Sequence, residues 1–97
     1  MATFIVLANF TDQGIKNVKE TVGRAEAFKE MARKTGVTIK EIYWTLGSRD
    51  IVAICEAADA DAATALSLSV ASRGNVKSET LRGFSLAEMH KIIGKMV

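Results

Sequence analysis

The residues with the greatest capacity for chemistry lie on or beside stretches that read as β-strands. Glu56 and Arg82 supply a carboxylate and a guanidinium. Tyr43, Thr45 and Asp50 flank a predicted hairpin turn. Because charged groups on strands need partners when they are covered, these five residues are candidates for a small ligand-binding cluster in an apolar pocket. The alternative is that Glu56 and Arg82 are exposed or form a structural ion pair.

Other kinds of chemistry lack the residues that they need. The sequence has one histidine and one cysteine, so one chain cannot build a multi-histidine or Cys-x-x-Cys metal site. It also lacks the glycine-rich phosphate loops and the His-Glu-x-x-His motif. We therefore predict neither a metal nor a cofactor. The lone Cys55 excludes an intrachain disulfide and, among aliphatic neighbours, predicts a small buried side chain in a reducing compartment.

Composition and charge favour an ordinary globular domain. The 97 residues correspond to a single domain over residues 1–97, with 48% hydrophobic and 25% charged residues. A net charge of +2 is too weak to imply a nucleic-acid or membrane partner. No apolar run approaches the roughly 20 residues of a membrane span, and the first ten residues do not resemble a signal peptide. A cytoplasmic protein is expected.

Two stretches, residues 3–10 and 51–56, are apolar at both odd and even positions. A strand of this kind has to be covered on both faces, so both are predicted to be central strands. The helices of so short a chain are enough to cover one face of a sheet. The other face is therefore expected to be covered by a second copy of the chain or by a ligand.

The segments between these strands read as two helices and one irregular strand. Apolar spacing from Ile15 predicts one continuous helix, capped by Thr11 or Asp12 and ended by Gly36. In residues 37–46 the apolar positions change parity near Lys40 and Glu41, which predicts either a β-bulge or a strand whose two halves pack against different surfaces. A second helix follows over residues 60–73 and stops at the Gly-Asn pair 74–75.

The C-terminal part begins with a polar strand over residues 76–84, as expected of a sheet edge. Ser85 and Glu88 form a capping-box motif directly before an amphipathic stretch, which predicts a terminal helix. The order is β-α-β-β-α-β plus this helix. Right-handed crossovers then place both main helices on one face of a four-stranded antiparallel sheet, so the fold class is α+β and ferredoxin-like.

Four phrases of the sequence resemble one known family. They are Asn-Phe-Thr-Asp-Gln-Gly-Ile at residues 9–15, Glu-Ile-Tyr-Trp-Thr-Leu-Gly at 41–47, Asp-Ile-Val at 50–52, and Gly-Asn-Val-Lys-Ser-Glu-Thr-Leu-Arg at 74–82. Together they are similar to the GYD domain family of short bacterial proteins. The family's Gly, Tyr, Asp signature falls on Gly47, Arg49 and Asp50, with Arg49 in place of the aromatic residue. The resemblance implies a ferredoxin-like fold of the dimeric α/β-barrel type and assigns no activity.

Three functions stay open at this point. The preferred prediction is a homo-oligomer, at least a dimer, whose copies cover the second sheet face and could hold a small molecule there. The first alternative is a small cofactor-independent enzyme, oxygenase- or isomerase-like, with a pocket between the sheet and a partner subunit. The second is a structural or regulatory interaction module. RNA binding by base stacking is not expected, because residues 51–56 contain no aromatic side chain.

Overall fold

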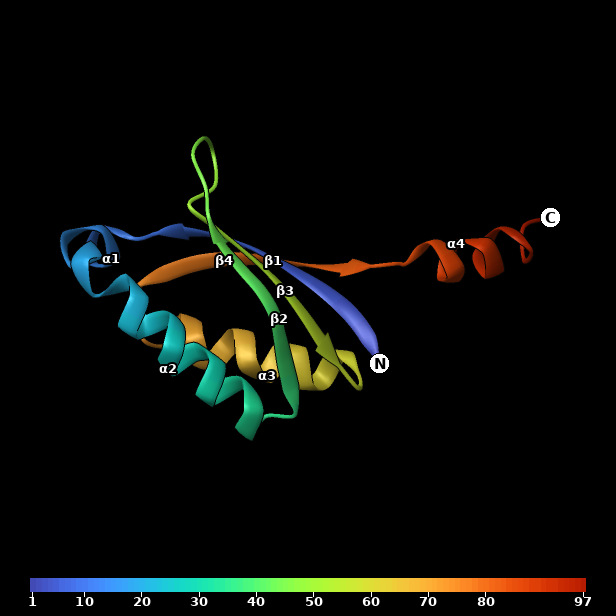
Figure 1. The fold of residues 1–97 in the computed structure, drawn as a ribbon, viewed down its shortest axis with the longest axis horizontal. Coiled ribbons are helices and arrows are strands. Elements are labelled where there is room, and N and C mark those ends of the chain that lie inside the picture. The colour runs from blue at the N-terminus through green and yellow to red at the C-terminus, as the bar shows by residue number, and fades with distance from the viewer.

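The computed structural model describes residues 1–97 and contains one four-stranded antiparallel sheet with strand order β2-β3-β1-β4. Its strands are β1 (Ala2–Phe10), β2 (Val37–Trp44), β3 (Ile51–Ala57) and β4 (Val76–Gly83). The central positions of β1 and β3 and the edge position of β4 confirm the sequence predictions. This order, with two crossover helices, is the ferredoxin-like fold (Figure 1).

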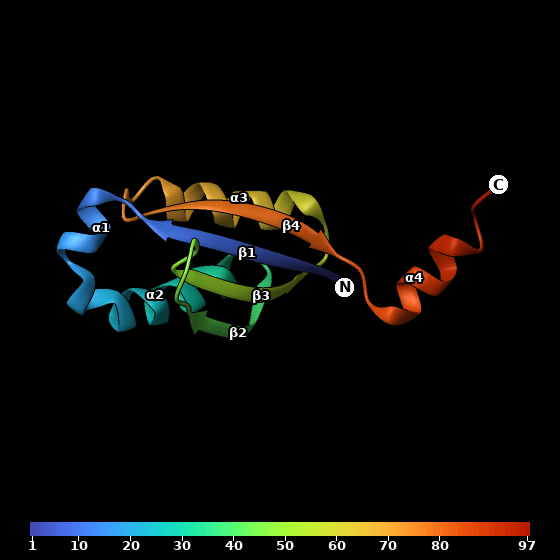
Figure 2. The ribbon, with the colours of Figure 1, turned by 90° about the horizontal axis from the view of Figure 1, so that it is seen from above.

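Two helices, α2 (Thr21–Lys34) and α3 (Ala60–Ala71), pack against the same face of the sheet (Figure 1). The Asp59 side chain accepts a hydrogen bond from the backbone amide of Ala62 and so caps α3. Gly36, with φ of 81°, follows the C-cap of α2 in the left-handed region, as predicted. No helix lies against the opposite face of the sheet, which we call the open face (Figures 1 and 2).

The helix predicted to be continuous from Ile15 is divided in the structure. It consists of α1 (Asp12–Lys16), a short 3-10 helix η1 (Val18–Glu20), and α2. Asn17 lies at the break with φ −109° and ψ 30°, outside the helical range. The apolar residues of this first part do not form the buried stripe that their spacing predicted, because Ile15 is exposed.

Tertiary hydrogen bonds explain the break. The Thr11 hydroxyl accepts from the amide of Gly14 at 3.1 Å and donates to the carbonyl of Gly74 at 2.6 Å. This pair of bonds fastens α1 to the loop before β4, so the chain has to change direction before α2 can follow the sheet. Arg24 then donates to the carbonyls of Gly14 and Asn17, each at 3.2 Å, and satisfies backbone groups near the break.

The predicted bulge in β2 is present. The register with β3 shifts between Ile39 and Glu41, which leaves Lys40 as the extra residue. Because one added residue reverses the side-chain parity, Ile39 and Ile42 both face the helices. Apolar residues of both halves of β2 therefore contribute to the same side of the sheet.

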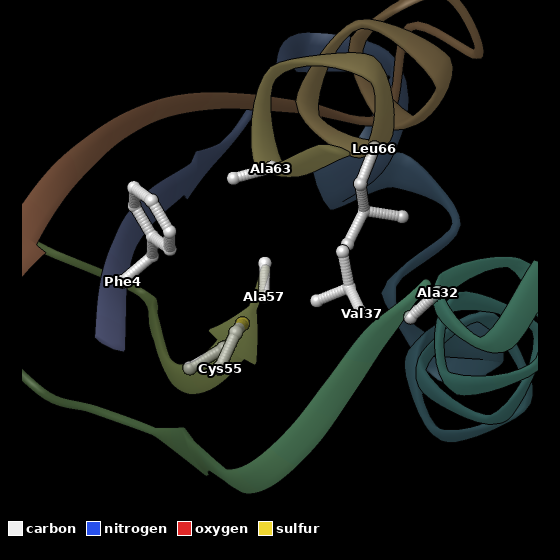
Figure 3. Close-up of a cluster of buried hydrophobic side chains, with 8 residues drawn as sticks. Phe4, Ala32, Val37, Cys55, Ala57, Ala63 and Leu66 are labelled. Atoms are coloured by element: carbon white, nitrogen blue, oxygen red, sulfur yellow. The ribbon is translucent and has the colours of Figure 1, made fainter. Parts of the chain in front are cut away.

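The core lies between the helices and the sheet and consists mainly of small side chains. Side chains from three strands and both helices converge there in Figure 3. Its buried members are Phe4, Ala32, Val37, Ala53, Cys55, Ala57, Ala63 and Leu66. Because half of these residues are alanines, the core side chains contribute little volume between the helices and the sheet.

The C-terminal helix α4 (Leu86–Ile93) projects beyond the end of the sheet (Figures 1 and 2). The predicted capping box is present: Ser85 Oγ accepts from the Glu88 amide at 3.1 Å, and the Glu88 carboxylate accepts from the Ser85 amide at 3.0 Å. None of the residues of α4 is buried. The apolar stripe of this helix is thus formed but has no partner within the chain.

Candidate functional site

The open face carries an apolar patch over its two central strands. Strand pairing places Ile5 opposite Ile54 and Leu81, and Leu7 opposite Val52. Directly opposed residues of an antiparallel pair share one face, so these side chains lie side by side on the face without helices. We call this set the open-face patch; with Tyr43, which pairs with Val52, its members are Ile5, Leu7, Tyr43, Val52, Ile54 and Leu81.

Charged residues surround the open-face patch as ion pairs. Arg49 reaches from the hairpin to Glu79 of β4 at 2.8 Å, and Lys40 lies 3.6 Å from Glu56. The side chains are between about one third and one half exposed, so each pair contributes little to stability alone. An apolar centre with a polar rim is the arrangement found in protein–protein interfaces.

The hairpin tip between β2 and β3 is fastened to the end of β1 by Asp50. Its carboxylate accepts from the amide of Phe10 at 2.9 Å, and its own amide donates to the Ala8 carbonyl at 3.0 Å. Thr45 closes the turn from the other side, because its hydroxyl donates to the Arg49 carbonyl at 2.6 Å. Asp50 and Thr45 therefore have structural contacts that hold Arg49 beside the open face.

Arg82 lies on the helix-side face, because it is paired with Phe4 rather than with an open-face residue. Its guanidinium stacks over the Phe84 ring at 4.5 Å from the centroid and binds the Glu88 carboxylate at 3.0 Å. The hydrogen bond from the Ser85 amide and then the Arg82 guanidinium lower the pKa of Glu88 below its usual value. Arg82 thus secures the start of α4.

The five predicted ligand-binding residues do not form one cluster. Tyr43 and Glu56 lie on the open face, Thr45 and Asp50 belong to the hairpin tip, and Arg82 is on the other side of the sheet. The Tyr43 hydroxyl donates to Glu41 at 3.3 Å and is half exposed. A ligand-binding role for these residues stays a prediction.

Three further features concern the thiol, the possible metal ligands and the helices. Cys55 is buried as predicted, and burial raises the pKa of its thiol to about 11, which keeps it protonated and unreactive at neutral pH. No three His, Cys, Asp or Glu side chains gather where they could hold a metal ion. None of the helices has the length and apolar character needed to cross a membrane.

Sequence reasoning missed two features of the surface. The Arg49–Glu79 pair joins residues 30 positions apart, and it depends both on the hairpin tip being fastened to β1 and on the register of β1 with β4. The apolar stripe of α4 was predicted, but its exposure was not: Leu86 is 92% and Ile93 57% exposed. The available signal was the short connection, because only Phe84 and Ser85 separate β4 from α4 and leave little chain for the helix to turn back onto the sheet.

Strand order and helix placement define a ferredoxin-like domain, and the open-face patch lies on the sheet face that no helix covers. The model of the GYD domain family matches residues 4–93, and the chain belongs to this family. It is 38% identical over 90 residues to the "Glutamine synthetase and cystathionine beta-lyase binding protein" of Thermus thermophilus, covering 92% of this chain and 95% of that protein.

A solved structure supports the fold. The crystal structure of TTHA0845 from Thermus thermophilus superposes with a TM-score of 0.58 at 23% identity, covering 88% of this chain and 95% of that one. At this level of identity the likeness concerns the fold alone. The predictions of a GYD domain and of a ferredoxin-like α+β architecture are both confirmed.

Proposed function

We propose that this chain is a protein-interaction module that pairs with a second copy through the open face and binds another protein through α4. The observation that carries the proposal is the open-face patch, which lies over the two central strands and has a rim of paired charges. Patches of this composition are typical of interaction sites.

The exposed area of the single chain supports association. Its accessible surface is 6658 Å². A compact monomer of 10.5 kDa is expected to expose about 5,400 Å². The surplus of roughly 1,200 Å² exceeds the ~800 Å² that each partner buries in an interface of standard size. Covering the open face and α4 would reduce the accessible surface area of the chain to the value expected for its mass.

The Thermus thermophilus relative supports the proposal that the chain binds another protein, since the name of that relative describes a protein that binds two enzymes. Helix α4 is suited to a contact of this kind, because a capped amphipathic helix can place its apolar stripe in a groove of another protein. Its anchors are Leu86, Met89 and Ile93, continued by Met96 just beyond the helix. Glutamine synthetase and cystathionine beta-lyase are therefore the first partners to test.

Pairing of two open faces would form the dimeric α/β-barrel arrangement, and a small molecule could be held between the two sheets beside Tyr43 and Glu56. A cytoplasmic location is also part of the proposal. It is supported by the lone buried thiol, which needs no oxidising compartment.

Self-association is tested with Val52→Glu, which places a charge in the open-face patch. Light scattering at micromolar concentration should give at least a dimer for the unmodified chain and a monomer for the variant, because burying an unpaired carboxylate is costly. Val22→Glu is the matched control, since Val22 is 58% exposed on α2 and should leave the mass unchanged. A monomeric unmodified chain would refute self-association.

Partner binding is tested separately with purified glutamine synthetase and cystathionine beta-lyase from the same organism. Surface-immobilised protein should retain at least one of the two enzymes at micromolar concentration. If the Val52→Glu variant also retains the enzyme, the enzyme contacts a surface outside the open face. Failure to bind either enzyme would remove these partners without affecting the dimer result.

A further inference from the structure

A mostly apolar cavity lies on the opposite side of the sheet from the open face. A cavity of about 210 Å³ separates the sheet from α2 and α3. It is lined along the length of β1, from Phe4 to Phe10, and 18 of its 25 lining residues are hydrophobic. A lining of this composition favours an apolar occupant, because such an occupant makes dispersion contacts with the lining atoms.

The charged groups of the cavity are of one sign. Arg24 and Arg73 line it, and no carboxylate does. Both arginines lie at the α1 end of the sheet, because Arg24 donates to Gly14 and the Arg73 carbonyl accepts from Gln13. The Arg73 guanidinium makes no hydrogen bond or ion pair within the chain and is available to a ligand. The cavity therefore combines an apolar length with a cationic end.

We propose that this cavity binds a small amphipathic carboxylate, such as a medium-chain alkyl carboxylate. The alkyl chain would lie along β1 between the helices, and the carboxylate would bind Arg73 and the free donors of Arg24. Guanidinium groups bind carboxylates through paired, charge-assisted hydrogen bonds. The volume is below the roughly 300–1,000 Å³ of sites for drug-sized molecules, so the ligand is small.

This site is independent of the proposed dimer, because the cavity and the open-face patch lie on opposite faces of the sheet. An experiment can therefore refute ligand binding while it supports self-association, or refute self-association while it supports ligand binding. The charges of the cavity also predict that it binds a carboxylate and not a cation with the same alkyl chain, because the cation would meet two arginines and no acidic group.

The first experiment uses decanoate and decyltrimethylammonium as probes in isothermal titration calorimetry, both below their micelle-forming concentrations. Decanoate should bind with one molecule per chain and raise the melting temperature, whereas the cation should not bind. Arg73→Ala should weaken decanoate binding about tenfold, the loss expected for a charge-assisted contact. Arg33→Ala is the matched control, because Arg33 lies on α2 outside the cavity.

A second variant tests the apolar part of the site. Ala25→Leu adds volume to the cavity lining and should abolish decanoate binding while the circular dichroism spectrum stays unchanged. Ala65→Leu, on the exposed side of α3, should bind decanoate as the unmodified chain does. The proposal is overturned if decanoate does not bind, if the cation binds equally, or if Arg73→Ala binds as tightly as the control. These outcomes do not depend on the folding of Ala25→Leu.

Discussion

The carboxylate of Asp50 accepts a hydrogen bond from the backbone amide of Phe10 at 2.9 Å, across 40 residues of sequence. This bond joins the tip of the β2–β3 hairpin to the end of β1. The ladder between β1 and β3 ends at Ala8, so the carboxylate gives the Phe10 amide a partner that β3 does not provide. Asp50 thus has a structural task in this chain.

Replacing Asp50 with alanine should destabilise the fold. The substitution leaves a partly buried amide without a partner and removes a hydrogen bond to a charged acceptor, which is worth about 1.5–3 kcal/mol. Urea denaturation at fixed protein concentration measures the difference. Arg49→Ala, which removes only the exposed pair with Glu79, should cost less than about 1 kcal/mol. Equal effects of the two variants would contradict this role for Asp50.

Gly14 is the position where a side chain is least tolerable. A Cβ atom there would lie 1.9 Å from the Asn75 carbonyl oxygen. Gly14→Ala should therefore destabilise the domain by about 3 kcal/mol or more, since backbone has to move. Gly23→Ala in α2 meets nothing within 4 Å and should stabilise by about 0.5–1 kcal/mol. Thermal unfolding of the pair provides the measurement, and similar melting temperatures would refute the close approach.

The start of α4 should respond to acid. The pKa of Glu88 is lowered below its ordinary value of 4.5, first by the Ser85 amide and then by Arg82. A lowered pKa means that the carboxylate stabilises the helix start above about pH 4.5, and that this contribution is lost as the pH falls through the lower folded-state pKa. The Ser85 amide resonance in NMR spectra should shift over that acidic range. In Glu88→Gln the shift should disappear.

Cys55 should be inert in the folded protein. Burial raises the pKa of its thiol from 9.0 to about 11, so hardly any thiolate exists at pH 8. Iodoacetamide should modify the folded chain far more slowly than the chain in guanidinium chloride, as followed by mass spectrometry. The protonated thiol favours the folded state, and this contribution declines as the pH rises from about 9 to 11. Equal rates in both states would show that the thiol is accessible.

The stripe of α4 should matter for binding and not for folding. Ile93 is exposed, so Ile93→Ser should change the free energy of unfolding by less than about 0.5 kcal/mol. Under the proposed function the same variant should weaken retention of the partner enzyme, measured on the immobilised protein. Lys91→Ser alters an exposed charged position of the same helix and is the control. A large loss of stability in Ile93→Ser would show that α4 packs within its own domain.

Much of the fold could be predicted because the controlling signals are local. Apolar residues on both sides of β1 and β3 indicate their central places, and the parity change near Lys40 indicates the bulge. Ser85 and Glu88 form their reciprocal bonds within four residues. The break at Asn17 could not be read in this way, because the bonds from Thr11 to Gly74 join distant parts of the chain.

The candidate site was harder to predict for a related reason. Residue type identified Glu56 and Arg82 as charges on strands. The face of the sheet on which each side chain lies depends on how the strands pair, which residue type does not reveal. Arg82 is opposite Phe4 and Glu56 is opposite Thr3, so the two charges lie on different faces. The cavity was not foreseen either, because its size depends on how far the helices stand from the sheet.

The two outer strands limit how copies of this chain can join. Strand β2 is interrupted by the extra residue Lys40, and β4 carries Lys77 and Glu79 among polar neighbours. Both features discourage a foreign strand from extending the sheet sideways. If two open faces pair as proposed, the contact is self-limiting, because two identical surfaces satisfy each other and leave nothing free to add a third. Growth into fibres is then not expected.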